Sequence, residues 1–425
     1  MFDLIVKGGT LPDGRVADIG IRGDKITAVD KLEGAEAGQV IDATGDLVCP
    51  PFVDPHFHMD ATLSYGQPRV NASGTLLEGI ALWGELKTIA TIDEMKARAL
   101  EYCDWAVSMG LLAIRSHVDT CDPDLKGVQA LLDVREAVKP YIDLQLVAFP
   151  QDGLYRDPKA LEQTLRALDM GLDVVGGIPH FERTMADGSR SITELCQIAA
   201  ERGLPVDMHC DETDDPMSRH IEMLAHETQR LGLQRRVAAS HLTSMHSMDN
   251  YYVSKLIPLI AESQISAIAN PLINIVIQGR HDTFPKRRGL TRVKEMQAQG
   301  ITVGWGQDCV LDPWYPLGTA DMLDVAFMGL HVAQMTHPDE MRRCFDMVTE
   351  ENARILGLQG YGLAPGCTAS LVVLDAGNPT EALRLRPDRL AVVAKGKLVS
   401  AKARNNSRLS LPGRPESVRR RHRTG

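Results

Sequence analysis

The sequence predicts an α/β fold: a (β/α)8 TIM barrel with a small β-sandwich domain formed from both termini. Three observations predict it. Apolar strands alternate with amphipathic helical stretches through the middle of the chain. Eight such strands occur there, which is the number that closes a barrel of this kind. Short strand patterns separated by turns stand at both ends of the 425 residues.

The strands at the two ends are expected to share one sheet. Residues 2–48 and 369–399 both contain short apolar runs cut by glycine-containing turns. Neither end has enough strands to bury a core alone, so we expect them to fold together. The expected divisions are 1–48 and 356–403 for the two parts of the β-domain, 49–355 for the barrel, and 404–425 for a basic, disordered tail.

The barrel strands are expected where the apolar runs fall. They are residues 47–56, 111–117, 142–149, 174–178, 206–209, 237–241, 265–269 and 301–305. Helical patterns such as 91–108, 158–169 and 191–202 lie between them. A doubly wound open sheet is the alternative, because it also alternates strands with helices.

Charge and composition exclude several classes of protein. The formal net charge of −10 argues against a general nucleic-acid binder, which needs a basic surface. The chain has no run of about 18 apolar residues that would span a membrane, and its first residues lack the pattern of a signal peptide. The eight cysteines are scattered without a C-x-x-C pair, which is typical of a reducing cytoplasm.

Five metal-binding side chains follow or end the expected strands. His56 and His58 are two apart on the first strand, so both imidazoles face the same side. His209 ends the fifth strand, His241 ends the sixth, and Asp308 follows the eighth. In a barrel these strand ends meet at one mouth. Imidazoles with one carboxylate suit a divalent ion such as zinc or ferrous iron, with a position left for water.

The pattern favours one ion and a hydrolytic reaction. A bound ion lowers the pKa of a coordinated water from about 15.7 to about 7, which makes a nucleophile available at neutral pH. The fourth strand and its end, residues 173–180, contain no lysine that could be carboxylated to bridge two ions. We therefore expect a single metal ion.

The chain resembles the amidohydrolase superfamily and, within it, the bacterial cytosine deaminase family. The resemblance extends to about residue 400. It is carried by the segments 73–80, 147–151, 208–212, 240–247, 284–289 and 312–318.

The resemblance implies a role for each site residue. The implied metal ligands are His56, His58, His209 and Asp308. His241 matches the histidine that holds and polarises the attacking water, and Glu212 matches the acid that handles protons at the ring nitrogen. Gln151 matches the amide that reads the carbonyl edge of a pyrimidine, while Leu76 and Trp314 match the substrate-facing pattern.

These roles imply hydrolytic deamination of a free pyrimidine base. Activated water attacks C4, Asp308 moves the proton of the water to the departing amine, and Glu212 neutralises charge at N3. Ammonia leaves and a carbonyl remains. Members of the family commonly assemble, so a homo-oligomer is also implied.

The chain departs from the family beside its last ligand. Cytosine deaminase has His-Asp-Asp there, whereas this chain has Gln307, Asp308 and Cys309. A thiol is smaller and more apolar than a carboxylate, which makes room for a substituent at C5. We expect 5-methylcytosine to be deaminated to thymine at least as well as cytosine is to uracil. The alternative is that Cys309 only adjusts packing and cytosine stays preferred.

Other activities and roles stay open from the sequence. The metal set also fits deamination of isocytosine, creatinine or an aminotriazine, and a catalytically inactive barrel that binds a partner is the alternative from another class. His117 and Asp119 end the second strand and are candidates to orient a ligand imidazole. His180 and His246 are interpreted as ordinary hydrogen-bonded or exposed histidines.

Overall fold

The structure is a computed structural model that describes residues 1–404 and 406–418. Its larger part is a barrel of eight parallel strands in the order β13-β12-β11-β10-β9-β8-β7-β6. The strands are β6 (Phe52–Phe57), β7 (Leu111–Asp119), β8 (Asp143–Phe149), β9 (Val174–Gly177), β10 (Val206–Cys210), β11 (Val237–His241), β12 (Ser266–Ala269) and β13 (Val303–Trp305). A parallel bridge between Phe57 and Asp308 joins the two ends of this sheet. The predicted barrel is therefore confirmed, and the open doubly wound sheet is excluded.

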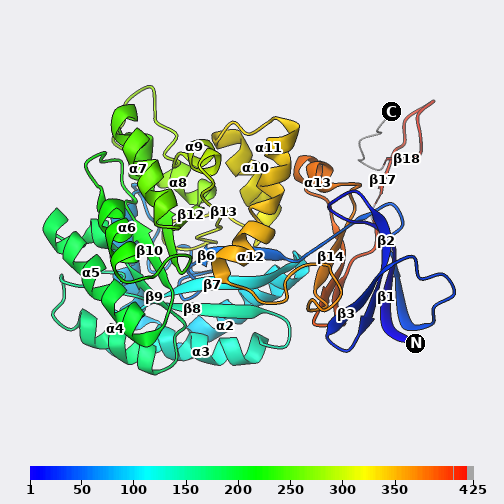
Figure 1. Cartoon of the computed structure of the whole chain (residues 1–425), viewed down its shortest axis with the longest axis horizontal. Helices are drawn as coiled ribbons and strands as arrows, with labels where there is room; N and C mark the ends of the chain where they lie inside the picture. The colour runs from blue at the N-terminus through cyan, green and yellow to red at the C-terminus, as the bar shows by residue number, and fades with distance from the viewer. Residues whose placement is uncertain (405, 419–425) are drawn as a thin grey trace.

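Helices surround the barrel strands (Figure 1). The helices of the first half are α1 (Leu76–Ile89), α2 (Ile92–Ser108), α3 (Lys126–Val138), α4 (Ala160–Asp169), η1 (Pro179–Phe181), α5 (Met185–Arg202) and α6 (His220–Arg230). Those of the second half are η2 (Thr243–His246), α7 (Asn250–Glu262), α8 (Pro271–Ile277), α9 (Val293–Ala298), α10 (Met322–Val332), α11 (Pro338–Asp346), α12 (Glu350–Leu356) and α13 (Pro379–Leu385). Helix α2 begins after Thr91, whose side chain forms a reciprocal capping box with Glu94.

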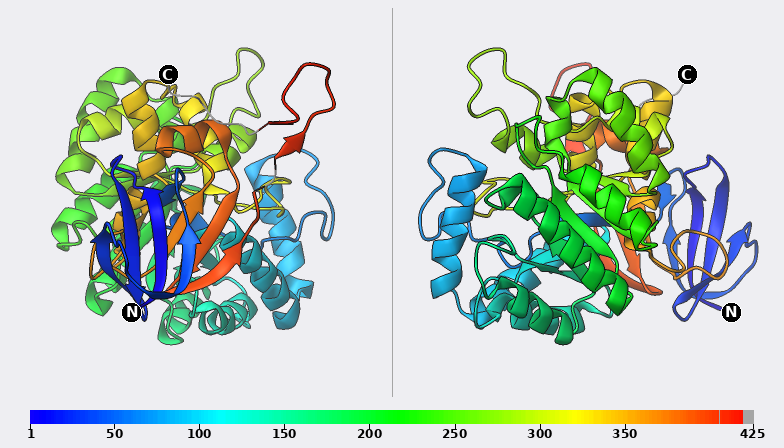
Figure 2. Two further views of the ribbon diagram at one scale, coloured as in Figure 1. Left: turned by 90° about the vertical axis from the view of Figure 1, so that its right-hand side faces the viewer. Right: turned by 60° about the vertical axis from the view of Figure 1, so that its left-hand side comes forward.

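The two ends of the chain form one β-domain beside the barrel, as the sequence predicts (Figures 1 and 2). Its strands are β1 (Phe2–Thr10), β2 (Val16–Arg22), β3 (Lys25–Asp30), β4 (Ala37–Asp42), β5 (Leu47–Cys49), β14 (Leu371–Leu374), β15 (Arg389–Ala394) and β16 (Lys397–Ala401). They belong to a single hydrogen-bonded sheet that branches at β1. Antiparallel pairing of β5 with β14 joins the two ends. Residues from both ends, such as Ile19 and Leu371, share a separate apolar core.

The first expected barrel strand is in fact two strands with different partners. Residues 47–49 are β5 of the terminal domain, whereas the barrel begins with β6 at Phe52. Pro50 and Pro51 separate them. Because proline has no N–H to donate to a ladder, consecutive prolines end one strand before the next begins.

Part of the segment 404–425, for which the sequence predicts a basic, disordered tail, lies within the described residues. The short strands β17 (Ser407–Arg408) and β18 (Ser417–Val418) pair antiparallel. Before them, the Arg404 guanidinium pairs with the buried carboxylate of Asp46 in the β-domain. The arginine cluster at 419–423 lies outside the described residues.

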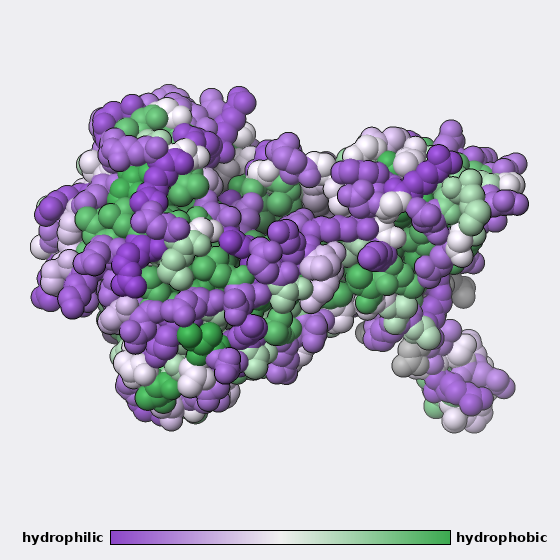
Figure 3. Space-filling view, turned by 90° about the horizontal axis from the view of Figure 1, so that it is seen from below, coloured by the Kyte–Doolittle hydropathy of each residue, from purple (hydrophilic) through white to green (hydrophobic). Residues whose placement is uncertain are grey.

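The surface of the molecule mixes polar and apolar residues. In Figure 3, hydrophilic residues are interspersed with hydrophobic ones across the face seen from below. Among the described residues, no helix combines the length and the apolar character that crossing a membrane requires.

Candidate active site

Four histidines and an aspartate meet at the carboxyl ends of the barrel strands. His56 lies on β6, His58 directly follows it, His209 lies on β10, His241 ends β11, and Asp308 follows β13. All five side chains are buried. Ligand atoms of His56, His209, His241 and Asp308 all lie within 4.8 Å of one another. The structure therefore brings together every residue that the sequence predicts around the ion.

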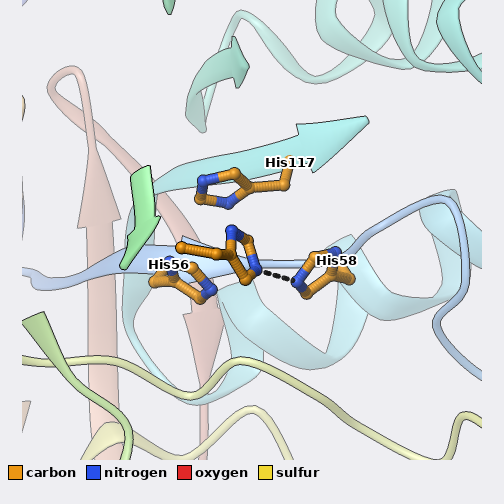
Figure 4. Close-up of side chains that lie close together, drawn as sticks. His56, His58 and His117 are labelled. Carbon is orange, nitrogen blue, oxygen red and sulfur yellow. Dashed lines mark hydrogen bonds between the residues drawn. The ribbon is translucent and has the colours of Figure 1, made fainter. Parts of the chain in front are cut away.

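The atoms of the cluster converge at short distances. His58 Nε2 lies 3.0 Å from His209 Nε2, the contact that is dashed in Figure 4. Asp308 Oδ1 lies 3.2 Å from His56 Nε2 and 3.3 Å from His58 Nε2. His56 Nε2 and Asp308 Oδ1 are buried without a hydrogen-bond partner among the described residues. Buried polar atoms of this kind need a partner, and a cation shared by the cluster supplies one.

The residues fit a single divalent ion. Four ligands at about 2.05 Å from a tetrahedral ion lie about 3.3 Å apart. The three measured separations of 3.0, 3.2 and 3.3 Å approach this value. Imidazole nitrogens with one carboxylate oxygen are the donors that zinc and ferrous iron accept.

Backbone geometry turns two of these side chains into the mouth. His241 and Asp308 adopt left-handed conformations, with φ of 72° and 66°. Residues other than glycine rarely adopt such angles, which concentrate at functional sites. Hydrogen bonds hold Asp308 to the first strand: its N–H donates to the His56 carbonyl at 2.8 Å, and its carbonyl accepts from the His58 N–H at 3.0 Å. Asp308 is thus fixed relative to His56 and His58.

Electrostatics keep two of the four imidazoles, those of His209 and His241, neutral. Burial and the neighbouring histidines hold the pKa values of His209 and His241 well below the usual range. Although burial opposes its charge, the surrounding His241 and His56 hold the pKa of Asp308 well below the usual range. Neutral imidazoles and an ionised carboxylate are the forms that bind a metal ion.

A small, partly open cavity lies beside the cluster. It is lined by His58, Leu76, Gln151, Ile178, His209, Glu212, Ile273, Ile277, Asp308, Cys309 and Trp314. The cavity combines an apolar wall with a few polar groups, as small-molecule sites do. All four residues that the sequence predicts to face a substrate are among its walls.

Glu212 and Cys309 are both held in their neutral forms. Burial, and then the charge of Asp308, raise the pKa of Glu212 well above its usual range. Glu212 Oε1 lies 3.2 Å from His241 Nδ1. Burial, followed by the nearby carboxylates, raises the pKa of the Cys309 thiol well above its usual range. The cavity therefore presents a carboxylic acid that can donate a proton and an unreactive, apolar thiol.

The indole of Trp314 packs directly on helix α1. A Cβ placed on Gly79 would lie 2.1 Å from Trp314 Cδ1, so only glycine leaves room for the ring. The backbone N–H groups of Trp314 and Tyr315 donate to Asp312 Oδ1 at 2.9 Å each. Leu76, at the start of α1, lines the same cavity. These contacts fix the wall of the cavity formed by α1 and the loop after β13.

Several site residues were not anticipated from the sequence. Ile178, Ile273 and Ile277 complete the apolar wall. The Asn274 amide lies 3.0 Å from His241 Nδ1, and the Asn270 amide lies 3.3 Å from the same nitrogen. A polar residue at the end of a barrel strand is the only signal that could have pointed to Asn270, which directly follows β12.

The histidines and the aspartate left unassigned by the sequence have separate surroundings. The ring of His117 lies 4.2 Å from that of His56, and burial followed by His56 lowers the pKa of His117 to about 3. Asp119 accepts hydrogen bonds from Trp83 and Lys87 of α1, at 2.8 Å each. His180 Nδ1 lies 3.1 Å from the His209 carbonyl oxygen. His117 therefore packs on a ligand, whereas Asp119 holds α1.

A closed barrel with this cluster and cavity at its carboxyl end defines a hydrolase whose site suits one divalent metal ion. The model of the amidohydrolase family matches residues 39–400, and the chain belongs to this family. The family and the relatives described next identify it as a hydrolase acting on carbon–nitrogen bonds.

Three relatives show how close the similarity is. The crystal structure of 5-methylcytosine deaminase from Klebsiella pneumoniae, liganded with 5-fluorocytosine, is 42% identical with a TM-score of 0.93, and the match covers 95% of this chain and 99% of that one. N-isopropylammelide isopropyl amidohydrolase from Pseudomonas sp. (strain ADP) is 31% identical over 94% of this chain and 97% of its own length. Pterin deaminase from Rhizobium rhizogenes is 28% identical over 93% of this chain and 87% of its own length.

Proposed function

We propose that the protein deaminates a free aminopyrimidine base, converting 5-methylcytosine to thymine and cytosine to uracil with release of ammonia. The observation that carries this proposal is the meeting of Gln151, Glu212 and Cys309 with the metal cluster around one cavity. The similarity to a 5-methylcytosine deaminase supports the same substrate class.

We propose His56, His58, His209 and Asp308 as the residues that hold the ion, zinc or ferrous iron. An ion held by these residues would supply an acidified water with a pKa of about 7. Asp308 accepts the proton of this water and passes it to the amine that leaves C4. Glu212, neutral because it is buried, donates its proton at N3 as charge develops there, and it takes up the remaining proton of the C4 hydroxyl as the carbonyl forms.

The other proposed roles follow from position in the cavity. The amide of Gln151 donates to and accepts from the carbonyl and ring-nitrogen edge of the base. His241 orients the attacking water, and the amides on its ring hold its side chain in place. Leu76 and Trp314 pack against the faces of the flat ring. Cys309 accommodates the methyl group at C5, where a carboxylate would fill the space and attract water.

A second candidate substrate is an aminotriazine. The relative from Pseudomonas acts, by its name, on N-isopropylammelide, and it matches nearly the whole chain. The higher identity of 42% to the 5-methylcytosine deaminase favours the pyrimidine.

The proposal also extends to partners and location. The formal net charge of −10 supports free bases over nucleic acid as substrates. The eight free cysteines support a reducing, cytoplasmic location. A homo-oligomer is proposed from the habit of the family, and light scattering of the purified protein tests it.

The experiment is a substrate panel. Metal-loaded protein is incubated with 5-methylcytosine, cytosine, isocytosine, creatinine, an aminotriazine, cytidine and single-stranded DNA, and ammonia is measured. We expect ammonia from 5-methylcytosine and cytosine. Turnover of the nucleoside or DNA, or of the triazine alone, overturns the proposed substrate class. Absence of metal from the protein, with no activity after adding zinc, iron or manganese, would favour an inactive binding barrel.

A further inference from the structure

A chain of hydrogen bonds lies behind the metal ligand His56. The hydroxyl oxygen of Ser240, on β11, lies 2.8 Å from His56 Nδ1. The same oxygen lies 2.8 Å from Asp207 Oδ1, on β10. All three side chains are fully buried. On its other side, Asp207 Oδ2 accepts a hydrogen bond of 3.0 Å from the Arg115 guanidinium.

The direction of each hydrogen bond follows from this geometry. The buried guanidinium of Arg115 stabilises the ionised form of Asp207, and an ionised carboxylate can only accept. Ser240 has a single proton and therefore donates it to Asp207. The serine oxygen then accepts a hydrogen bond from His56, whose Nδ1 must carry the proton. In a neutral imidazole protonated at Nδ1, the lone pair is on Nε2.

That lone pair faces the proposed metal site. His56 Nε2 lies 3.2 Å from Asp308 Oδ1 and has no hydrogen-bond partner among the described residues. The ring cannot turn freely, because His117 packs on it with ring centroids 4.2 Å apart. His117 Nε2 also lies 3.6 Å from Asp207 Oδ1, so both neighbours of the ring converge on one carboxylate.

We propose that Asp207 and Ser240 are positioning residues that hold His56 in its Nδ1-protonated tautomer and so prepare Nε2 to bind the ion. Ligand histidines usually donate to a carboxylate, carbonyl or water. Here His56 donates to the Ser240 hydroxyl, which in turn donates to the Asp207 carboxylate. The inference rests on the proposed metal site but not on the proposed substrate.

Two variants separate positioning from mere packing. Ser240→Ala removes the acceptor at Nδ1 and lowers zinc affinity by about 10–100-fold, the usual loss when such a partner is removed. Asp207→Asn keeps the shape of the side chain but reverses the direction of the hydrogen bonds that join residue 207, Ser240 and His56. The Arg115 guanidinium still needs an acceptor, so the amide oxygen faces Arg115 and the amide NH₂ faces Ser240. The serine oxygen then accepts from the amide, and the Ser240 hydroxyl donates its proton to His56 Nδ1. Nε2 becomes protonated, and we expect a larger loss of zinc affinity than in Ser240→Ala.

The double variant should bind zinc more tightly than Asp207→Asn alone. A second loss of packing would instead weaken zinc binding further. Without the Ser240 hydroxyl, nothing forces the wrong tautomer in Asp207→Asn. Adding Ser240→Ala to Asp207→Asn should therefore restore zinc affinity to about the level of Ser240→Ala alone, about 10–100-fold below the native protein. Ser263→Ala is the matched control, because Ser263 is also buried and hydrogen-bonded but lies at the end of α7. Its zinc affinity should stay within about twofold of the native value.

Two readouts decide the matter without measuring activity. Zinc affinity is measured by competition with a chromophoric chelator. The tautomer of His56 is read from long-range nitrogen–proton correlation spectra of the metal-free protein labelled with 15N-histidine, with His56→Gln used for assignment. We expect a protonated Nδ1 in the native protein and a protonated Nε2 in Asp207→Asn. Circular dichroism shows whether each variant is folded.

The outcomes distinguish this inference from the proposed metal site. A native protein that binds no zinc contradicts the metal site itself. A native protein that binds zinc but carries the His56 proton on Nε2 when metal-free overturns the inference, as does native zinc affinity in Ser240→Ala. If Asp207→Asn fails to fold, the native spectrum and the affinity of Ser240→Ala decide alone.

Discussion

Replacing Cys309 with aspartate should shift substrate preference from 5-methylcytosine toward cytosine. The Cys309 side chain lines the cavity and is only 3% exposed, so a larger side chain at this position must take up space in the cavity or displace its neighbours. A carboxylate fills the space of the methyl group and keeps water near it. The nearby carboxylates of Asp308 and Asp312 would repel the charge of the new side chain.

The magnitude follows from the contact that is lost. One methyl group in a fitting apolar pocket contributes about 1–3 kcal/mol, or about 10–200-fold in kcat/KM. The ratio of kcat/KM for 5-methylcytosine to that for cytosine should therefore fall by at least about tenfold in Cys309→Asp. The loss should come mainly from 5-methylcytosine, since cytosine has no group at C5 to displace.

Initial rates for both bases, followed by the change in ultraviolet absorbance, give the two kcat/KM values. Cys309→Ser is close in size and uncharged, so its ratio should move less than that of the aspartate variant. Cys196→Ser replaces a buried thiol in α5, outside the cavity, and should leave the ratio unchanged. An unchanged ratio in a folded, metal-loaded Cys309→Asp protein would refute the role given to Cys309, and so would a clear preference of the native protein for cytosine.

Three further substitutions test other parts of the site. Gly79→Ala should displace Trp314 at a cost of about 1–3 kcal/mol and raise KM about tenfold. The control is Gly84→Ala, in an open position of the same helix. It should raise the free energy of unfolding by about 0.5–1 kcal/mol and leave KM unchanged. Glu212→Gln should lower kcat by about 10²–10⁴-fold while metal content, measured by inductively coupled plasma analysis, stays at one ion per chain; an unchanged kcat would remove Glu212 from proton transfer. Lys87→Met leaves the buried carboxylate of Asp119 and the partly exposed carboxylate of Asp152 without their cation, and it should lower the free energy of unfolding in urea by about 3 kcal/mol; a stability equal to that of the native protein would contradict this role of Lys87.

Much of the fold could be predicted because its pattern is local. The barrel strands are short apolar runs, several of which end at or just before a polar residue such as His58 or His241, and the parallel topology gathers those residues at one end. The closure between Phe57 and Asp308 and the split at Pro50 and Pro51 were less accessible. Both features depend on which strands pair with each other. An apolar run looks continuous in the sequence even where one part pairs in one sheet and the next part in another.

The candidate site was predictable in its residue types but not in its supporting contacts. Alternation along β11 places Ser240 and His241 on opposite faces, so the sequence gives no reason to expect both near the ion. The left-handed backbone at His241, with φ of 72°, turns its side chain into the mouth while Ser240 faces the interior. Asp207 lies two residues before His209 on the same face of β10, so alternation along this strand does indicate that the two side chains point the same way.

The central claim is that this cluster supports metal-dependent deamination of a free pyrimidine. Its most direct test follows 5-methylcytosine by chromatography in the presence of chelator-stripped protein, before and after one equivalent of zinc or ferrous iron is added. We expect thymine and ammonia to form in equal amounts only after the metal is restored. Product formation by the stripped protein, or none after metal binding has been verified, would contradict the claim.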